Sequence, residues 1–236
     1  MMKKRLFFPL LCVLVMLIAG IGCEHKDSEA SVDMYNEACE DAVFADTDEI
    51  YDCLVAITQD NDNLEWNDGM VLVVTFTHFP DSYPQGECIQ TWWGETWVTV
   101  VPELKTYYEG LTVAIDNPVL RVEQILGLPK GSGNEWFAEL WVNPRDLYRP
   151  CPDSEITDSV CGLTFPDNTS DEYIDWFNNQ IIESYFQEHK YPWTRLGYTY
   201  DWGDPTNEIG LSEFIIRQGA EVLVEKLERF EDYLQE

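Results

Sequence analysis

The sequence predicts an α+β domain: a mainly antiparallel sheet, an N-terminal disulfide-stapled helical hairpin and one long packed helix. Three observations predict this class. Apolar residues recur at helical spacing before residue 60 and again between residues 170 and 185. Runs rich in β-branched and aromatic residues lie between and after these segments. Because strands and helices do not alternate regularly, antiparallel pairing is expected rather than βαβ units.

The helical hairpin is predicted within residues 32–57. A capping box of Asp46 and Glu49 separates two series of apolar residues with helical spacing. Cys39 and Cys53 lie one in each half, so we expect a disulfide between them that staples the hairpin. The two apolar series are Met34, Ala38 and Ala42, then Ile50, Leu54 and Ile57.

Three strands and one short helix are predicted in the middle of the chain. Residues 70–79, 92–101 and 135–142 are rich in residues that favour strands, and Pro and Gly punctuate the connections. Residues 118–126 form an amphipathic stretch that begins with proline and is followed by glycine. These start and stop signals predict a helix.

A proline-punctuated loop and the most strongly patterned helix follow. The loop covers residues 144–166, and Cys151 and Cys161 bracket its central part, so we expect a second local disulfide there. Thr169 and Glu172 form a capping box before an apolar series that continues to Tyr185. Pro192 forbids continuation.

The C-terminal part returns to strand chemistry. Residues 194–202 and 211–216 are predicted strands on either side of a Gly-Asp-Pro turn, and residues 220–224 are a candidate third strand. Residues 227–234 are expected to end the chain as a helix. The pattern does not predict the order of the strands.

The first 23 residues resemble the export signal of bacterial lipoproteins. A basic start is followed by sixteen uncharged residues, too few to span a bilayer, and then by Gly20-Ile21-Gly22-Cys23. In this class small residues precede a cysteine that receives diacylglycerol before cleavage. Gly20 stands where the class usually carries Leu, which leaves an ordinary signal peptide or an uncleaved anchor as alternatives.

The resemblance implies a three-part organisation. Residues 1–22 are the expected signal peptide, residues 23–31 a lipidated cysteine with a short polar tether, and residues 32–236 a single globular domain. More than one acyl chain on Cys23 would hold the protein stably on a membrane. We therefore expect an exported protein, lipid-anchored to a bacterial envelope membrane and facing the periplasm or the cell exterior, where disulfides persist.

The composition restricts the partners. The chain has 44 acidic and 14 basic residues, a net charge of −30, and residues 1–22 include three of the bases but no acid. Nucleic acid and anionic lipid surfaces are therefore not expected partners. The membrane contact is expected to depend on the lipid of Cys23. Cys88 is left over after the two predicted disulfides, as a free or intermolecular thiol.

The sequence lacks the motifs of well-signposted enzymes. It has no G-x-S-x-G elbow, H-E-x-x-H helix, phosphate-binding loop or dinucleotide fingerprint. His78 and His189 are not spaced to share a metal with each other or with a cysteine pair. No cofactor and no metal site are predicted, and a non-enzymatic role is favoured.

One aromatic run is a candidate binding region. Trp92, Trp93 and Trp97 flank Glu95, and aromatic faces beside a carboxylate can hold a sugar ring or a cation. The alternative is that these residues are ordinary parts of a strand. Arg145 and Arg195 are further candidates for a ligand carboxylate, with internal ion pairing as the alternative.

The expected function is a binding or structural module of the envelope. Its partner is expected to be an envelope protein or a glycan. The alternative is an envelope hydrolase that uses either a pair of carboxylates or a metal held by His78 with Asp81 and Glu87.

Overall fold

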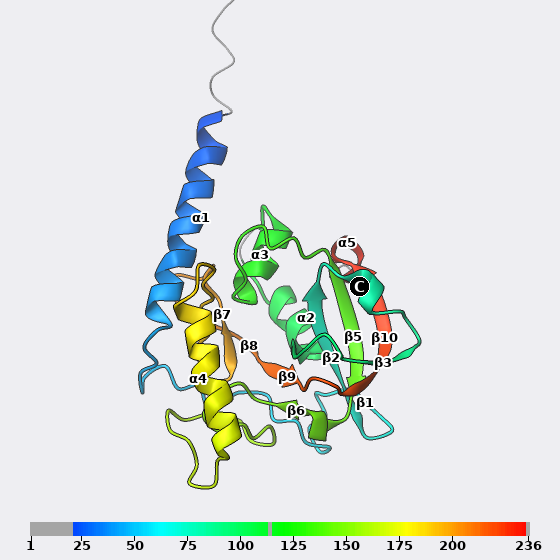
Figure 1. Cartoon of the computed structure of the whole chain (residues 1–236). Coiled ribbons are helices and arrows are strands. Elements are labelled where there is room, and N and C mark those ends of the chain that lie inside the picture. Colours follow the sequence, from blue (N-terminus) through cyan, green and yellow to red (C-terminus); the bar gives the residue numbers. More distant parts are fainter. Residues whose placement is uncertain (1–20, 113–114, 235–236) are drawn as a thin grey trace, which may run out of the picture.

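The computed structural model describes residues 21–112 and 115–234, and only the backbone for residues 21–30. An eight-stranded sheet forms the body of the domain, every strand pair in it is antiparallel, and a two-stranded sheet lies beside it (Figure 1). The predicted α+β class is confirmed. Residues 1–20, which hold most of the predicted signal peptide, lie outside the described residues.

The sheet joins strands that are distant in sequence. Its order is β3 (Cys88–Gln90), β10 (Glu221–Arg229), β5 (Trp136–Val142), β2 (Met70–Thr77), β4 (Thr96–Val100), β9 (Phe214–Ile216) and β6 (Leu147–Tyr148), and β1 (Trp66–Asn67) pairs with β2. The smaller sheet pairs β7 (Tyr198–Tyr200) with β8 (Ile209–Ser212).

Helices cover one face of the large sheet. They are α2 (Val101–Glu109), α3 (Pro118–Ile125) and the short α5 (Phe230–Tyr233), and their apolar side chains share a core with those of β2 and β5. The longer helices α1 (Ile21–Asp41) and α4 (Asp171–Tyr185) lie together beside the smaller sheet (Figure 1). Two 3-10 turns complete the elements, η1 (Pro80–Ser82) and η2 (Pro144–Asp146).

Most predicted elements are present. Strands β2, β4 and β5 fall within their predicted ranges, and α3 begins where Asn117 accepts a hydrogen bond from the Leu120 amide. The long helix α4 is also confirmed, with Ser170 as its N-cap in place of the expected Thr169. Helix α2 was not expected, because β4 ends before Val101 and Pro102 then opens a helix.

The prediction of an N-terminal helical hairpin was wrong. Residues 21–41 form one helix, whereas residues 50–57 run without helix along the body of the domain. The amides of Leu54 and Ile57 donate to carbonyl groups of Ser159 and Ile156. These contacts fix the segment in an extended course, because its backbone groups bond to a distant loop rather than within a helix.

The disulfide that was expected to staple the hairpin is absent for the same reason. Cys39 is a buried free thiol near the end of α1, and Cys53 is an exposed free thiol on the extended segment. Glu49 still reaches back to the Asp46 amide at 2.7 Å, so the capping contact forms around a turn and no helix follows it.

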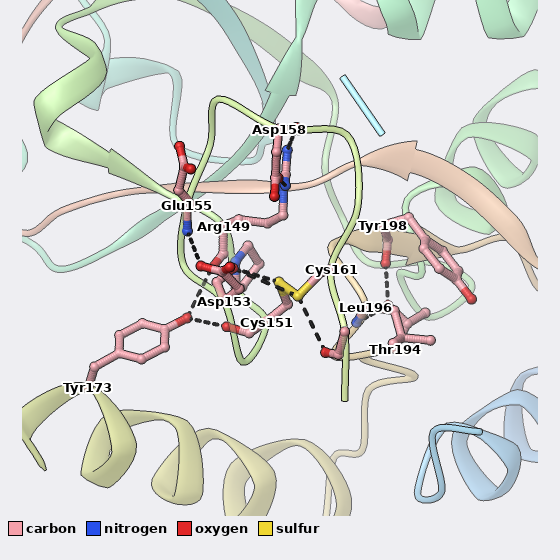
Figure 2. Close-up of a disulfide and its surroundings, with 12 residues drawn as sticks. Arg149, Cys151, Asp153, Glu155, Asp158, Cys161, Tyr173, Thr194, Leu196 and Tyr198 are labelled. Carbon is pink, nitrogen blue, oxygen red and sulfur yellow. Dashed lines mark hydrogen bonds and ion pairs between the residues drawn. A yellow bond between two sulfur atoms is a disulfide. The ribbon is translucent and has the colours of Figure 1, made fainter. Parts of the chain in front are cut away.

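The second predicted disulfide, Cys151–Cys161, is present (Figure 2). It closes a loop beside α4, whose Tyr173 hydroxyl donates to the carbonyl oxygens of Arg149 and Cys151. The fully buried Arg149 forms an ion pair with Asp158 at 2.6 Å. The disulfide, the ion pair and the tyrosine together fasten this loop to the domain.

Candidate functional site

A cleft lies between the large sheet, the end of α3 and α4. It consists of two adjoining chambers, with volumes of about 230 Å³ and 370 Å³. The sheet chamber is bounded mainly by β2 and β4, and the helix chamber by α4, β7 and the segment before β7. Five residues line both chambers and so mark their junction: Trp97, Leu126, Leu128, Thr199 and Glu213.

The sheet chamber lies where two neighbouring strands part. β4 pairs with β2 only through Thr99 and Val100, and its first three residues pair with β9 instead. Thr75 and Phe76 of β2 therefore have β5 on one side and no strand pairing on the other, and both line the chamber. The cleft thus follows from the sheet topology.

Glu213 is positioned by the change of strand between β8 and β9. Its amide donates to the Gly197 carbonyl at 2.9 Å. Ile215, two residues later, is the cross-strand partner of Trp97. Because side chains alternate along a strand, Glu213 and Trp97 share a face, and both line the two chambers.

The Glu213 carboxyl has no ion pair or hydrogen bond to any described residue. The side chain is half-buried, and the surrounding protein that displaces water from the carboxyl raises its pKa to about 8. Near neutral pH the group therefore remains mostly protonated. It can then donate as well as accept a hydrogen bond.

Most other polar groups around the cleft already have partners. The hydroxyl of Thr199 donates to the Ile125 carbonyl and accepts from the Leu211 amide. The indole of Trp93 donates to Thr96, and that of Trp193 donates to the Pro150 carbonyl. Among the acidic groups that line the cleft, Glu213 is therefore the one without a partner in the described residues, and Gln180 and Tyr191 add polar atoms to the helix chamber.

Glu95 provides the contrast. It also lines the sheet chamber, but its two oxygens accept from the Tyr148 hydroxyl at 2.7 Å and the Trp176 indole at 2.9 Å. These bonds link the start of β4 to β6 and α4. Glu95 was predicted as a binding residue, but its contacts give it a structural role.

The predicted binding residues divide into two groups. Trp93, Glu95 and Trp97 line the sheet chamber, whereas Trp92 is 74% exposed and lines neither chamber. The Arg145 side chain is 79% exposed beside Asp146. The structure therefore brings the aromatic run to the cleft only in part.

Arg195 also lies outside the lining of the cleft. It donates to the carbonyl oxygens of Ala42 and Val43 and stacks over the Tyr185 ring at 5.3 Å. Its backbone has a positive φ of 61°, which is uncommon for a residue other than glycine. Arg195 thus fastens the end of α1 to α4.

The residues of the metal-assisted alternative, His78, Asp81 and Glu87, do not form a metal-ligating group in the described part of the chain. His78 is exposed and pairs with Asn134 through Nδ1. A different acidic group, Asp41 with Glu49 and Glu208, brings three carboxylates within 4.8 Å of one another. Burial and mutual repulsion raise the pKa of Glu49 and Glu208, and tyrosine hydroxyls bond to Asp41 and Glu208.

Glu213 was not among the predicted binding residues. The available signal was an acid within the otherwise apolar run Leu211–Ile216, which was interpreted as a single strand. Only the tertiary pairing shows that the chain changes sheets at this residue. The sequence pattern likewise does not mark Trp193 or the tyrosines of the helix chamber, whereas it does mark Trp97.

Comparison with known proteins does not assign the chain to a family. No family model, no curated protein and no solved structure matches the chain. Among the helices of the described residues, none combines the length and apolar character needed to cross a bilayer.

Proposed function

We propose that this chain is a lipid-anchored bacterial envelope protein whose domain binds a glycan or protein partner. One observation carries the binding role: a half-buried carboxyl without a protein partner among the described residues lies where two aromatic-lined chambers meet. Ligand sites are commonly concave and mainly apolar, with a few polar groups that fix orientation. The cleft has this character, and a part of the partner would enter it.

The aromatic walls support the same proposal. Trp97 and Trp193 meet edge to face at 6.2 Å with an angle of 88° between their rings. Both line the helix chamber together with Tyr191 and Tyr200. Rings that are already packed lose little freedom when a ligand binds, and this favours affinity.

The anchor part of the proposal rests on the sequence signal at Cys23. The acidic surface supports it indirectly, because a chain of net charge −30 is repelled by an anionic bilayer. A covalent lipid would therefore hold the domain at the membrane.

The binding role is tested by two tryptophan variants. Purified wild-type domain is incubated with insoluble peptidoglycan and, separately, with detergent extracts of envelopes, and bound material is quantified after pelleting or pull-down. Trp97→Ala should reduce retention at least about tenfold, because an anchor at the centre of an interface contributes 2 kcal/mol or more. Trp92→Ala is the matched control, since Trp92 lies outside the cleft.

Equal retention of the two variants would contradict a role for the cleft. If wild-type protein is retained on neither material, the binding function itself fails. A structural role would then replace it.

A carboxylate-pair hydrolase is the alternative, because the raised pKa of Glu213 is typical of a general acid. The second carboxyl of the cleft belongs to Glu95. Both oxygens of Glu95 already accept hydrogen bonds, from the Tyr148 hydroxyl and the Trp176 indole. A glycosidase needs a second carboxyl that is free to act on water or the sugar, so binding is the better proposal. Turnover of peptidoglycan fragments that is lost in Glu213→Gln would favour the hydrolase.

A further inference from the structure

We infer that the cleft receives an organic ammonium group on an apolar stem, such as a lysine side chain, with Glu213 as its counter-ion. This inference rests on the proposed binding function and names the chemical class of the ligand. Its basis is the position of one uncompensated carboxyl among aromatic rings.

Glu213 differs from three other acids of the described residues that have partners within the protein. Glu103 accepts from Ser212 and Thr99, and Glu123 accepts from two backbone amides. Asp201 forms a bidentate ion pair with Arg121. Glu213 faces both chambers without such a partner, and the cationic group of a ligand would supply one.

The cleft does not fit a bare metal ion. Calcium takes six to eight oxygen ligands and magnesium six, whereas zinc prefers nitrogen and sulfur. Glu213 offers two oxygens, and the neighbouring Thr199 hydroxyl is already committed. Glu95 is committed as well. The cleft therefore lacks the ligands for a metal.

The cleft suits an amine on an apolar stem better than a sugar. A sugar ring carries several hydroxyls that need partners on burial. An ammonium on an apolar stem needs one carboxylate and is further stabilised by aromatic faces. Trp97 and Trp193 provide two nearly perpendicular walls, and Leu126 and Leu128 provide apolar surface for the stem.

The described part of the cleft has no positive charge of its own that would compete with a ligand for Glu213. No lysine, arginine or histidine is among the described residues that line the two chambers. The charge of −30 creates a field that attracts cations and repels anions. A ligand ammonium would therefore find Glu213 without an internal competitor.

Binding would transfer one proton. The carboxyl of Glu213 loses its proton to solvent as the ammonium enters, and the resulting carboxylate pairs with the cation, so charge and protons balance. The other titratable groups facing the cleft are Glu95 and four tyrosines, and Tyr185 of α4 lies near enough to interact with the charge of Glu213. These four tyrosines are Tyr83, Tyr191, Tyr198 and Tyr200.

The experiment compares phenethylamine with its neutral isostere, phenethyl alcohol, and with glucosamine. Affinities are measured by calorimetry and tryptophan fluorescence at several pH values, in two buffers that differ in ionisation enthalpy. We expect the amine to bind at least tenfold more tightly than the alcohol and than glucosamine. Its affinity should rise by up to about tenfold per pH unit between pH 6 and 8 and release up to one proton, whereas that of the alcohol should not change.

Glu213→Gln should remove the preference for the amine. Glu183→Gln is the matched control, because it removes the same formal charge from an exposed position on α4. The pH dependence in wild-type protein keeps the test decisive if Glu213→Gln fails to fold.

The outcomes separate the two proposals. Equal binding of amine and alcohol, or a preference that survives in Glu213→Gln, overturns the ammonium inference and leaves the cleft as a binding site. Tighter binding of glucosamine than of phenethylamine also overturns it, in favour of an amino sugar. If none of the three probes binds, the ammonium inference fails, whereas the proposed binding function is decided separately by retention on peptidoglycan and envelope extracts.

Discussion

At the scale of single residues, Glu103 and Glu213 are two neighbouring acids with different surroundings. Glu103 binds the amide and hydroxyl of Ser212, and these bonds oppose the rise in its pKa that burial causes. Glu213, the next residue in the chain after Ser212, has no such bonds, and burial alone raises its pKa. The first acid is structural, and the second is available to a ligand.

Glu213 should make the domain less stable as pH rises. Its carboxyl ionises near pH 4.5 in the unfolded chain but near pH 8 in the folded one. Between these values the unfolded state binds fewer protons, so the free energy of unfolding falls, by up to about 1.4 kcal/mol per pH unit. This contribution is fully present below pH 4.5 and is lost by about pH 8.

Glu213→Gln should abolish this slope. Urea unfolding of both proteins from pH 5 to pH 9 measures it, and the variant should gain stability relative to wild type as pH rises to 8 and not beyond. A constant difference across that range would show that Glu213 titrates normally in the folded state.

At the scale of elements, caps and apolar spacing in the sequence predicted correctly those helices that are fixed by contacts between residues close in sequence. Asn117 caps α3, and the apolar series of α4 lies on a helix as expected. The segment around Leu54 was wrong because its amides bond to the 151–161 loop, which is distant in sequence. A local sequence pattern contains no information on contacts between distant segments. The position of Glu213 also depends on such contacts, so the pattern did not predict it. The cysteines follow the same division: the pair that brackets a closed loop is bonded, and the pair that depended on the hairpin is not.

The Cys151–Cys161 disulfide should stabilise the domain. Replacing both cysteines by serine should lower the free energy of unfolding by roughly 3 kcal/mol, because the short loop is no longer closed in the unfolded chain. Chemical denaturation measures the change. Cys53→Ser is the control, since this exposed free thiol should alter stability by less than about 0.5 kcal/mol. Equal effects of the two changes would show that the loop is held without its disulfide.

At the scale of the whole molecule, α1 connects the domain to its proposed anchor. Its C-terminal half packs against the body, where Ser31 accepts from Lys130 and the Tyr35 ring meets Trp202 at 5.5 Å. Its backbone continues back through Cys23 and projects beyond the body (Figure 1). The expected short tether, residues 23–31, is thus helical, and Cys23 lies about 12 Å along the axis from Ser31.

Cys23→Ser should release the protein from membranes. Expressed in a bacterium with its full leader, wild-type protein should sediment with the membrane fraction and incorporate labelled fatty acid, whereas the variant should be found in the soluble exported fraction. Cys88→Ser, which changes an exposed cysteine of the domain, should behave as wild type. Retention of the Cys23→Ser protein in the membrane would favour an uncleaved anchor.

The central claim is that the cleft holds an uncompensated acid ready for a ligand, and the protonation of Glu213 tests it most directly. Carboxyl ¹³C chemical shifts of glutamate-labelled protein, with Glu213→Gln used to assign the resonance, give its pKa from a titration between pH 4 and 10. The account predicts a pKa of about 8 in the free protein. A value near 4.5 would show that solvent or a protein group already compensates the carboxylate, and would contradict the claim.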